Sequence, residues 1–270
     1  MTFALLTDSS CALPAASSEA ARVPIIEVPL SVEHAAGRPT TSQPSAAALL
    51  DALDRASLSG TRPVIAPVLS SKLSGTAQAL RQIVVEHGAD CQVIDTLTTG
   101  GTLGLAVLAA SRATSPAAAA AIVREVVAKS MTQLLVGDLK PLVAGGRLAL
   151  PSAMIGTALG IVPIIDVREG QLRLAEAVRG KKRARNRMIA RALTHLGARP
   201  ARAVPADGVD CFCHVPGDDP FPDEVAAALA VADVPVRDLR VAPLPEALTV
   251  HTGQTYWGLC LTPALAADIH

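Results

Sequence analysis

Short apolar runs alternate with longer amphipathic stretches through the first half of this chain. Runs with the length and composition of strands lie at residues 3–6, 23–32, 64–69, 91–94 and 133–137. Between them, apolar residues recur at helical spacing in 45–56, 76–87, 102–111 and 116–129. This alternation predicts a parallel sheet with helices on its faces. We expect residues 37–44 to form a loop, and Pro67 to make its strand irregular or place it at an edge.

Polar loops follow the carboxyl ends of three predicted strands. These loops are Asp8-Ser9-Ser10, Ser70 to Thr76, and Asp95 to Thr99. Ligands of open parallel sheets bind at this edge, outside the carboxyl ends of the strands. We therefore expect the loops to converge on a binding site. Asp8 and Asp95 either shape that site or serve as caps and turn formers.

The second half of the chain mixes hairpins with helices. Residues 159–167 and 172–178 are expected to form a hairpin, and further strands are expected at 209–215 and 234–241. Helices are predicted over 180–196, which is strongly basic, and over 222–232. The predicted fold class is therefore α/β with two domains. Residues 1–155 would form a parallel-sheet domain and residues 156–270 a mixed α+β domain.

Composition narrows the classes of function. The 270 residues carry no net formal charge, and 50% are hydrophobic but only 2% aromatic. Without surplus basic charge or stacking side chains, binding to nucleic acid or to an anionic membrane is disfavoured. No apolar stretch reaches the length of a membrane span and no signal peptide is evident, so we expect a cytoplasmic protein. The five cysteines show no CxxC spacing, which favours reduced thiols and no metal or cofactor.

The densest motif is Ser70-Ser71-Lys72-Leu73-Ser74-Gly75-Thr76, at a predicted junction between a strand and a helix. One hydroxyl suffices to cap a helix, whereas this stretch has four and a glycine that permits close approach of the backbone. Hydroxyl and amide donors beside a helix N-terminus suit an anion. The motif therefore favours an anion site, with helix capping as the simpler alternative. It matches neither a P-loop, a nucleophile elbow nor a dinucleotide-binding loop.

A series of short motifs stands in a fixed order along nearly the whole chain. They are TDSSCALP at 7–14, TSQPS at 41–45, SSKLSGTAQ at 70–78, VIDT at 93–96, LVAGGRL at 142–148, GIVPI at 160–164, AVRG at 177–180 and HTG at 251–253. Together they resemble the motifs of the DegV family. The chain departs from the family pattern at Ala77, Thr96, Gly160, Val162, Gln254 and Thr255.

The resemblance implies two α/β domains and a carrier that binds a long-chain fatty acid without hydrolysing it. It also implies a partner, a fatty acid kinase that phosphorylates the bound carboxylate. By motif position, Thr41 and Ser74 would bind the carboxylate and His251 would lie close by, with Arg147 and Arg179 near the mouth of the site. The complete set of predicted ligand-binding residues is Thr41, Ser74, His251, Ser71, Gly75, Thr76, Asp8, Ser9, Arg147 and Arg179.

Other interpretations remain open at this stage. The Ser/Thr/His cluster is also compatible with an acyl hydrolase or a phosphotransferase, and the chain with a lipid-sensing regulatory module. Without the resemblance, His251 would be an ordinary loop histidine. Arg147 either serves the site or simply caps the carbonyls of the preceding segment. The basic residues of 181–191 are either a solvated helix face or a docking surface for an acidic partner. No interface pattern stands out, so we expect a monomer.

Overall fold

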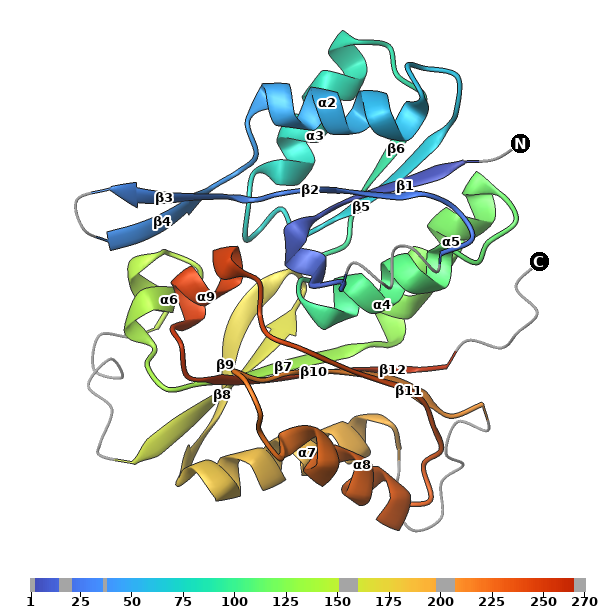
Figure 1. The fold of residues 1–270 in the computed structure, drawn as a ribbon. Coiled ribbons are helices and arrows are strands. Elements are labelled where there is room, and N and C mark those ends of the chain that lie inside the picture. Colours follow the sequence, from blue (N-terminus) through green and yellow to red (C-terminus); the bar gives the residue numbers. More distant parts are fainter. Residues whose placement is uncertain (1–2, 15–20, 36–37, 151–159, 198–206, 265–270) are drawn as a thin grey trace.

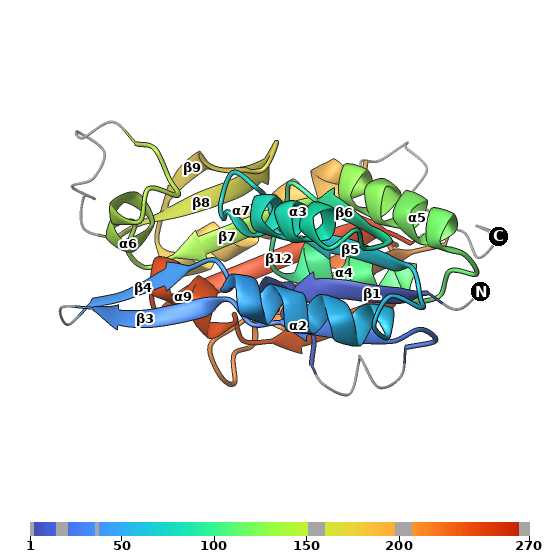
Figure 2. The same ribbon diagram turned by 90° about the horizontal axis from the view of Figure 1, so that it is seen from above.

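Sheets and layers of helices alternate through the body of the protein (Figures 1 and 2). The computed structural model describes residues 3–14, 21–35, 38–150, 160–197 and 207–264. The chain forms a four-stranded sheet and a six-stranded sheet. In Figure 1 the smaller sheet lies above the larger one, with helices between them and on both outer faces. The predicted α/β class, with a parallel sheet followed by a mixed one, is confirmed.

The smaller sheet is entirely parallel. Its strands are β1 (Ala4–Asp8), β2 (Ile25–Val28), β5 (Val64–Val68) and β6 (Cys91–Asp95), in the order β2-β1-β5-β6. The expectation that Pro67 places its strand at an edge is wrong, because β5 lies between β1 and β6. The ladder between β5 and β1 extends only to Ile65, so the missing N–H of Pro67 falls beyond it.

Alternate residues along strand β1 pack into two different hydrophobic cores, because successive side chains of a strand point to opposite faces of the sheet. Ala4 and Leu6 pack with the outer helices α2 (Ala46–Ser57) and α3 (Thr76–Glu86). Phe3 and Leu5 pack with the inner helices, α4 (Gly101–Ala110) and α5 (Pro116–Lys129). Helix α2 begins where predicted, because the Ser45 side chain accepts a hydrogen bond from the amide of Ala48.

Helix α4 is buried on almost every side because it lies between the two sheets (Figure 1). Glycines make this close packing possible. A Cβ at Gly101 would come within 2.6 Å of Phe212 Cβ on the larger sheet, and one at Gly104 within 2.5 Å of the Cys11 carbonyl oxygen. The larger sheet and the turn after β1 therefore approach α4 more closely than a side chain at these positions would permit.

The larger sheet is mixed and has the order β11-β10-β12-β7-β8-β9. Its strands are β7 (Met131–Val136), β8 (Ile161–Arg168), β9 (Gln171–Arg179), β10 (Val209–His214), β11 (Val236–Ala242) and β12 (Tyr256–Pro263). Helices α7 (Lys181–His195) and α8 (Phe221–Val231) cover its outer face.

Strand β7 corrects one expectation. The run at 133–137 was predicted to continue the parallel sheet, but β7 lies in the larger sheet, antiparallel to β12 and β8. A local pattern identifies a strand and not its partners, and here one partner is more than a hundred residues away. After β6 the chain thus passes from the smaller sheet to the larger one. The division into two domains at residue 155 stays a prediction.

A separate antiparallel hairpin projects from the body of the protein, as Figure 2 shows from above. It comprises β3 (Ser31–Ala35) and β4 (Arg38–Ser42), so the expectation of a loop at 37–44 is wrong for most of this segment. Polar residues on both faces of β4 hide the alternation that marks a half-buried strand. Two short helices, α6 (Lys140–Ala144) and α9 (Glu246–Thr252), lie beside the hairpin.

Candidate functional site

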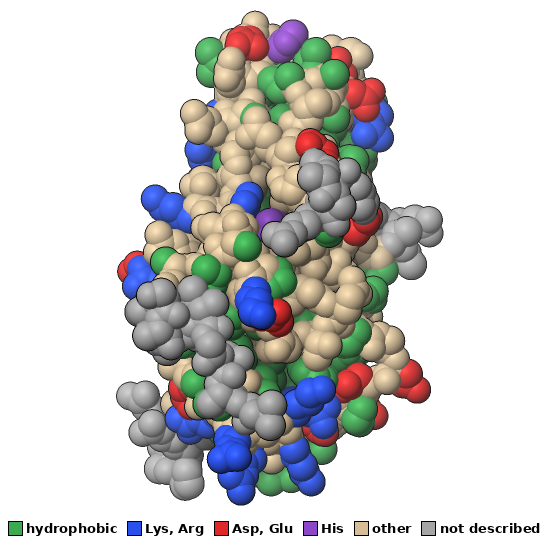
Figure 3. Space-filling view, turned by 90° about the vertical axis from the view of Figure 1, so that its left-hand side faces the viewer, with side chains coloured by type: hydrophobic (Ala, Val, Ile, Leu, Met, Phe, Trp, Pro, Cys, Tyr) green, Lys and Arg blue, Asp and Glu red, His purple; other side chains and the backbone are tan. Residues whose placement is uncertain are grey.

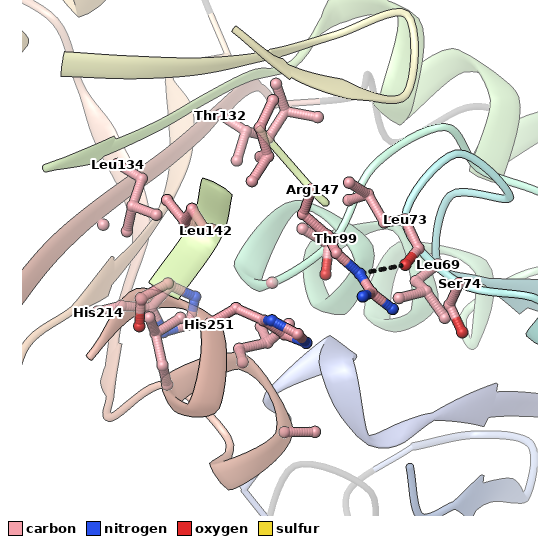
Figure 4. A pocket seen from close by; sticks show the side chains of 18 of the residues that line it. Leu69, Leu73, Ser74, Thr99, Thr132, Leu134, Leu142, Arg147, His214 and His251 are labelled. Carbon is pink, nitrogen blue, oxygen red and sulfur yellow. Dashed lines mark hydrogen bonds between the residues drawn. The ribbon is translucent and has the colours of Figure 1, made fainter. Parts of the chain in front are cut away.

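A pocket lies between the two sheets, beside the N-terminus of α4. The space between its atoms is about 870 Å³, including the part that is open to solvent. Most of its lining is apolar, including Leu69, Leu73, Leu134, Leu142, Leu172 and Leu244. Figure 4 shows Leu69, Leu73 and Ser74 on one side and Leu134, Leu142 and His214 on the other, with Arg147 and His251 between them. The lining has the composition of a site for an apolar ligand that carries a polar group.

Thr41 and His251 form the first polar contact of the pocket. Thr41 lies on β4 of the hairpin and His251 in the last turn of α9, and Thr41 Oγ1 is 2.6 Å from His251 Nε2. Burial, together with the nearby charge of Arg147, lowers the pKa of His251 to about 4. The imidazole is therefore neutral at pH 7, and the Thr41–His251 pair offers hydrogen bonds without a fixed charge.

Ser74 lines the same pocket from the loop between β5 and α3. Its hydroxyl lies 3.0 Å from Thr76 Oγ1, and its amide donates to the carbonyl of Ser70. Ser70 holds the loop in place, because its hydroxyl donates to Gly170 O at 2.7 Å and accepts from the amide of Lys72. Of the four hydroxyls in this motif, Ser74 is therefore the one that reaches the pocket.

Arg147 lines the pocket and also caps carbonyl groups. Its guanidinium donates to the carbonyl oxygens of Gly145 and, at 3.3 Å, Leu73. The second bond, drawn in Figure 4, joins the segment after α6 to the loop that carries Ser74. Arg147 thus caps carbonyls, as one interpretation of the sequence held, and it also lines the pocket, while a role in ligand use stays a prediction.

Asp8 and Ser9 support the site and do not line the pocket. The carboxylate of Asp8 is fully buried and accepts from the amides of Ser10, at 3.0 Å, and Leu69, at 2.8 Å, while burial raises its pKa. The hydroxyl of Ser9 accepts from the amide of Leu30 at 2.9 Å. These bonds confirm that the polar loops after β1 and β5 converge, and they position Leu69 and Leu30, which do line the pocket.

The remaining predicted residues lie outside the pocket lining. Ser71 is exposed, and its amide donates to Asp95 Oδ1 at 3.0 Å. Gly75 precedes α3 and packs against Gln43, since a Cβ there would come within 2.0 Å of Gln43 Oε1. Thr76 is buried at the start of α3. Arg179 is exposed at the end of β9.

The inner wall of the pocket includes Thr99, from the loop predicted to converge on the site, together with Thr132, His214 and Cys260, which sequence reasoning missed. His214 is buried, and its Nδ1 lies 3.1 Å from the carbonyl oxygen of Ala242, so Nδ1 carries the proton. Its Nε2 accepts from the amide of Gly101 at 2.8 Å, and burial lowers its pKa to about 4. The alternation of side chains along residues 209–214 indicates on which face of the sheet His214 lies. No local pattern indicates that its partner is Gly101, at the start of α4.

On one face of α7, the basic helix, arginine side chains form ion pairs with acidic side chains. Arg185 pairs with Asp219 and Glu224, and Arg187 and Arg191 both pair with Glu176. Lys and Arg side chains nevertheless gather at the lower end of the face in Figure 3, over the start of α7. Three basic residues at that end are exposed: Lys181, Lys182 and Arg183.

Two features are absent from the described residues. Within those ranges, no cluster of three or more His, Cys, Asp or Glu side chains is arranged to hold a metal ion. In the same part of the chain, no helix combines the length and the apolar character needed to cross a membrane.

Comparisons with known proteins agree on one family. The family model described as "Uncharacterised protein, DegV family" matches residues 30–264. A DegV domain-containing protein of Mycobacterium tuberculosis is 30% identical over 286 residues, which cover 97% of each chain. A fatty-acid-binding DegV family protein of Streptococcus agalactiae is 25% identical with a TM-score of 0.81, covering 98% of this chain and 100% of that one. A Thermus thermophilus structure described as fatty acid binding of a DegV family protein has a TM-score of 0.85 at 24% identity, with 98% and 100% coverage.

Proposed function

This chain belongs to the DegV family, and we propose that it binds a long-chain fatty acid in the pocket between its two sheets. The observation that carries the proposal is the distribution of polarity in that pocket. Leucines line most of its length, while Thr41, Ser74, His251 and Arg147 contribute their polar groups to it. The related Streptococcus agalactiae protein, whose structure is described as fatty acid binding, supports the proposal.

The energetics of such a ligand fit this arrangement. Burial of the acyl chain contributes about 0.8 kcal/mol per methylene, or on the order of 10 kcal/mol for a C16 chain before ordering costs. A carboxylate withdrawn from water needs hydrogen-bond donors. The hydroxyls of Thr41 and Ser74 would supply charge-assisted bonds, each contributing about 1.5–3 kcal/mol. The chain thus determines affinity and the polar groups determine orientation.

A carrier fits the Thr41–His251 pair better than an enzyme does. A separation of 2.6 Å between a hydroxyl and an imidazole is also that of a nucleophile and its base. An effective general base, however, has a pKa near the working pH, and the pKa of His251 lies at about 4. We infer that the pair binds the head group and does not activate Thr41 for acyl transfer.

The bound carboxylate would be presented to a fatty acid kinase. Thr41, Ser74, Arg147 and His251 are all partly exposed, so the head-group end of the pocket lies within reach of a partner enzyme. We expect Arg147→Ala to retain palmitic acid yet to slow formation of acyl phosphate when ATP and a fatty acid kinase are added. Normal acyl-phosphate formation by this variant would remove Arg147 from the proposal.

Mass spectrometry tests the proposed function directly. The purified full-length protein should release a fatty acid on solvent extraction, at close to one molecule per chain. After removal of lipid, it should bind palmitic acid and leave a p-nitrophenyl palmitate ester intact. An absence of binding, or turnover of the ester that is lost in His251→Gln, would contradict a carrier.

A further inference from the structure

The turn between β8 and β9 is buried against the polar loops that follow β5 and β6. It consists of Glu169 and Gly170, which both have positive φ, as a two-residue hairpin turn requires. Turns of this kind usually lie at the surface, and Glu169 is exposed, but Gly170 is buried. The larger sheet therefore reaches across to the loops of the smaller one at this point.

Ser70, in the loop after β5, receives this turn. It is fully buried, and its hydroxyl donates to the carbonyl oxygen of Gly170 at 2.7 Å. A Cβ on Gly170 would lie 2.5 Å from the same hydroxyl oxygen and 3.0 Å from a methyl carbon of Leu97. A side chain at residue 170 would therefore displace Ser70.

The other bonds of Ser70 hold the loop that carries Ser74. The carbonyl oxygen of Ser70 accepts from the amides of Leu73, at 2.9 Å, and Ser74, at 3.1 Å. Its hydroxyl accepts from the amide of Lys72 at 3.1 Å. Its own amide donates to the carbonyl oxygen of Thr98, in the loop after β6, at 2.9 Å. One residue thus joins the turn of the larger sheet to both polar loops.

The position of this loop matters because hydrogen bonds are directional. A hydrogen bond weakens steeply away from its preferred distance and angle, and bonds to a carboxylate are shorter than neutral ones. The side chain of Ser74 contacts only its near neighbour in sequence, since its hydroxyl lies 3.0 Å from Thr76 Oγ1. The backbone of the loop, held by Ser70, therefore determines where the hydroxyl of Ser74 meets a ligand.

We propose that Ser70 and Gly170 are positioning residues for the carboxylate. The turn of the larger sheet holds Ser70, and Ser70 holds the loop in which Ser74 meets the head group. The inference rests on the proposed function and names residues that determine its specificity for an acid. Both act through Ser74, because Ser70 and Gly170 themselves do not belong to the pocket lining.

An acid and an alcohol with the same chain separate positioning from general support of the fold. Lipid-free protein would be loaded with a fluorescent fatty acid, which is then displaced by myristic acid or by tetradecanol. The wild-type protein should prefer the acid, because the alcohol keeps the chain but lacks the carboxylate. In Ser70→Ala we expect this preference to fall about three- to tenfold, with little change in affinity for the alcohol.

Gly170→Ala disturbs the same contact from the larger sheet and should lower the preference for the acid in the same direction. Gly60→Ala is the matched control. Gly60 also has a positive φ, of 86° against 81° for Gly170, but an added Cβ there meets no atom within 4 Å. The two substitutions impose similar backbone strain, and only the one at residue 170 reaches Ser70. Gly170→Ala also tests the contact independently if Ser70→Ala fails to fold.

A double-mutant cycle identifies the residue through which Ser70 acts. Ser74→Ala should lower the preference for the acid by itself. Because Ser70 acts through Ser74, adding Ser70→Ala to this variant should lower the preference no further.

Three results would overturn the inference. They are an unchanged preference for the acid in Ser70→Ala and Gly170→Ala, an equal loss of affinity for acid and alcohol in both variants, and effects of Ser70→Ala and Ser74→Ala that multiply in the double variant. Equal binding of acid and alcohol by the wild-type protein would instead contradict the proposed function.

Discussion

Thr41 and His251 lie 2.6 Å apart, between Oγ1 and Nε2, although 210 residues separate them in the chain. The contact joins the projecting hairpin to α9, which precedes a strand of the larger sheet. It brings together the motifs TSQPS and HTG, and Ser74 and Arg147 line the same pocket. The polar end of the site is thus formed by segments that are distant in sequence.

Removal of the Thr41 hydroxyl should weaken binding of palmitic acid. Thr41→Val keeps the shape of the side chain but removes one donor to the carboxylate, and such bonds contribute about 1.5–3 kcal/mol. We expect the Kd from titration calorimetry to rise roughly ten- to hundredfold. Thr40→Val is the matched control, because Thr40 is the exposed neighbour on the same strand. Equal losses in the two variants would contradict a specific role for Thr41.

Gly145→Ala should displace His251. A Cβ at residue 145 would lie 2.7 Å from His251 Nδ1 and 3.1 Å from the carbonyl oxygen of Pro141, so the imidazole must move and its contact with Thr41 must change. We expect weaker binding of palmitic acid, by about threefold or more, with little change in thermal stability. Ala144→Ser, at an exposed position in α6, serves as the control. Wild-type affinity in Gly145→Ala would show that the position of His251 is unimportant.

His214 should make stability depend on pH. Burial lowers the pKa of His214 to about 4, from an ordinary value of 6.5. Between these values the unfolded chain binds a proton that the folded protein does not. The resulting stability is therefore complete above pH 6.5 and is lost as the pH falls toward 4, by on the order of 3 kcal/mol.

Urea unfolding between pH 7 and pH 4 measures this effect. In His214→Gln the decline in the free energy of unfolding should be smaller than in the wild-type protein. His87→Gln, at an exposed position, should leave the decline unchanged. A decline of equal slope in His214→Gln and the wild type would assign the pH dependence to other groups.

Gly104→Ala should destabilise the fold. The added Cβ would lie 2.5 Å from the backbone carbonyl oxygen of Cys11, which is not free to rotate away. We expect a loss of about 1–3 kcal/mol in the free energy of unfolding. Ala121→Leu adds a larger group at an exposed position of α5 and should change stability by less than about 0.5 kcal/mol. Similar effects of the two substitutions would contradict the tight packing of α4.

Much of the fold could be predicted because its signals are local. Ser45 and Pro116 mark the starts of α2 and α5, and the apolar runs at β1, β5 and β6 are short and bounded by polar loops. The hairpin of β3 and β4 was missed because its strands bury little apolar surface. The sheet to which β7 belongs was missed because its partner β12 lies at the other end of the chain.

The candidate site was predictable only in part, for a similar reason. Family motifs placed Thr41, Ser74, Arg147 and His251, and all four line the pocket. Asp8, Ser9 and Thr76 belong to the same motifs but serve the backbone or the start of a helix. The contacts of Thr132 with Thr102 and of His214 with Gly101 join the inner helix to the larger sheet, and no spacing in the sequence reveals them.

The walls of the pocket are divided between the two sheets. Whether the pocket holds a ligand therefore shows whether the two sheets have come together. Residues 1–129 would retain Thr41 and Ser74 but lose His251, Arg147 and the whole six-stranded sheet. Neither part of the chain encloses the ligand alone. A fatty acid retained through purification would therefore show that both halves had folded and packed against each other. For the same reason, loss of the ligand should be the earliest sign that the two layers have begun to separate.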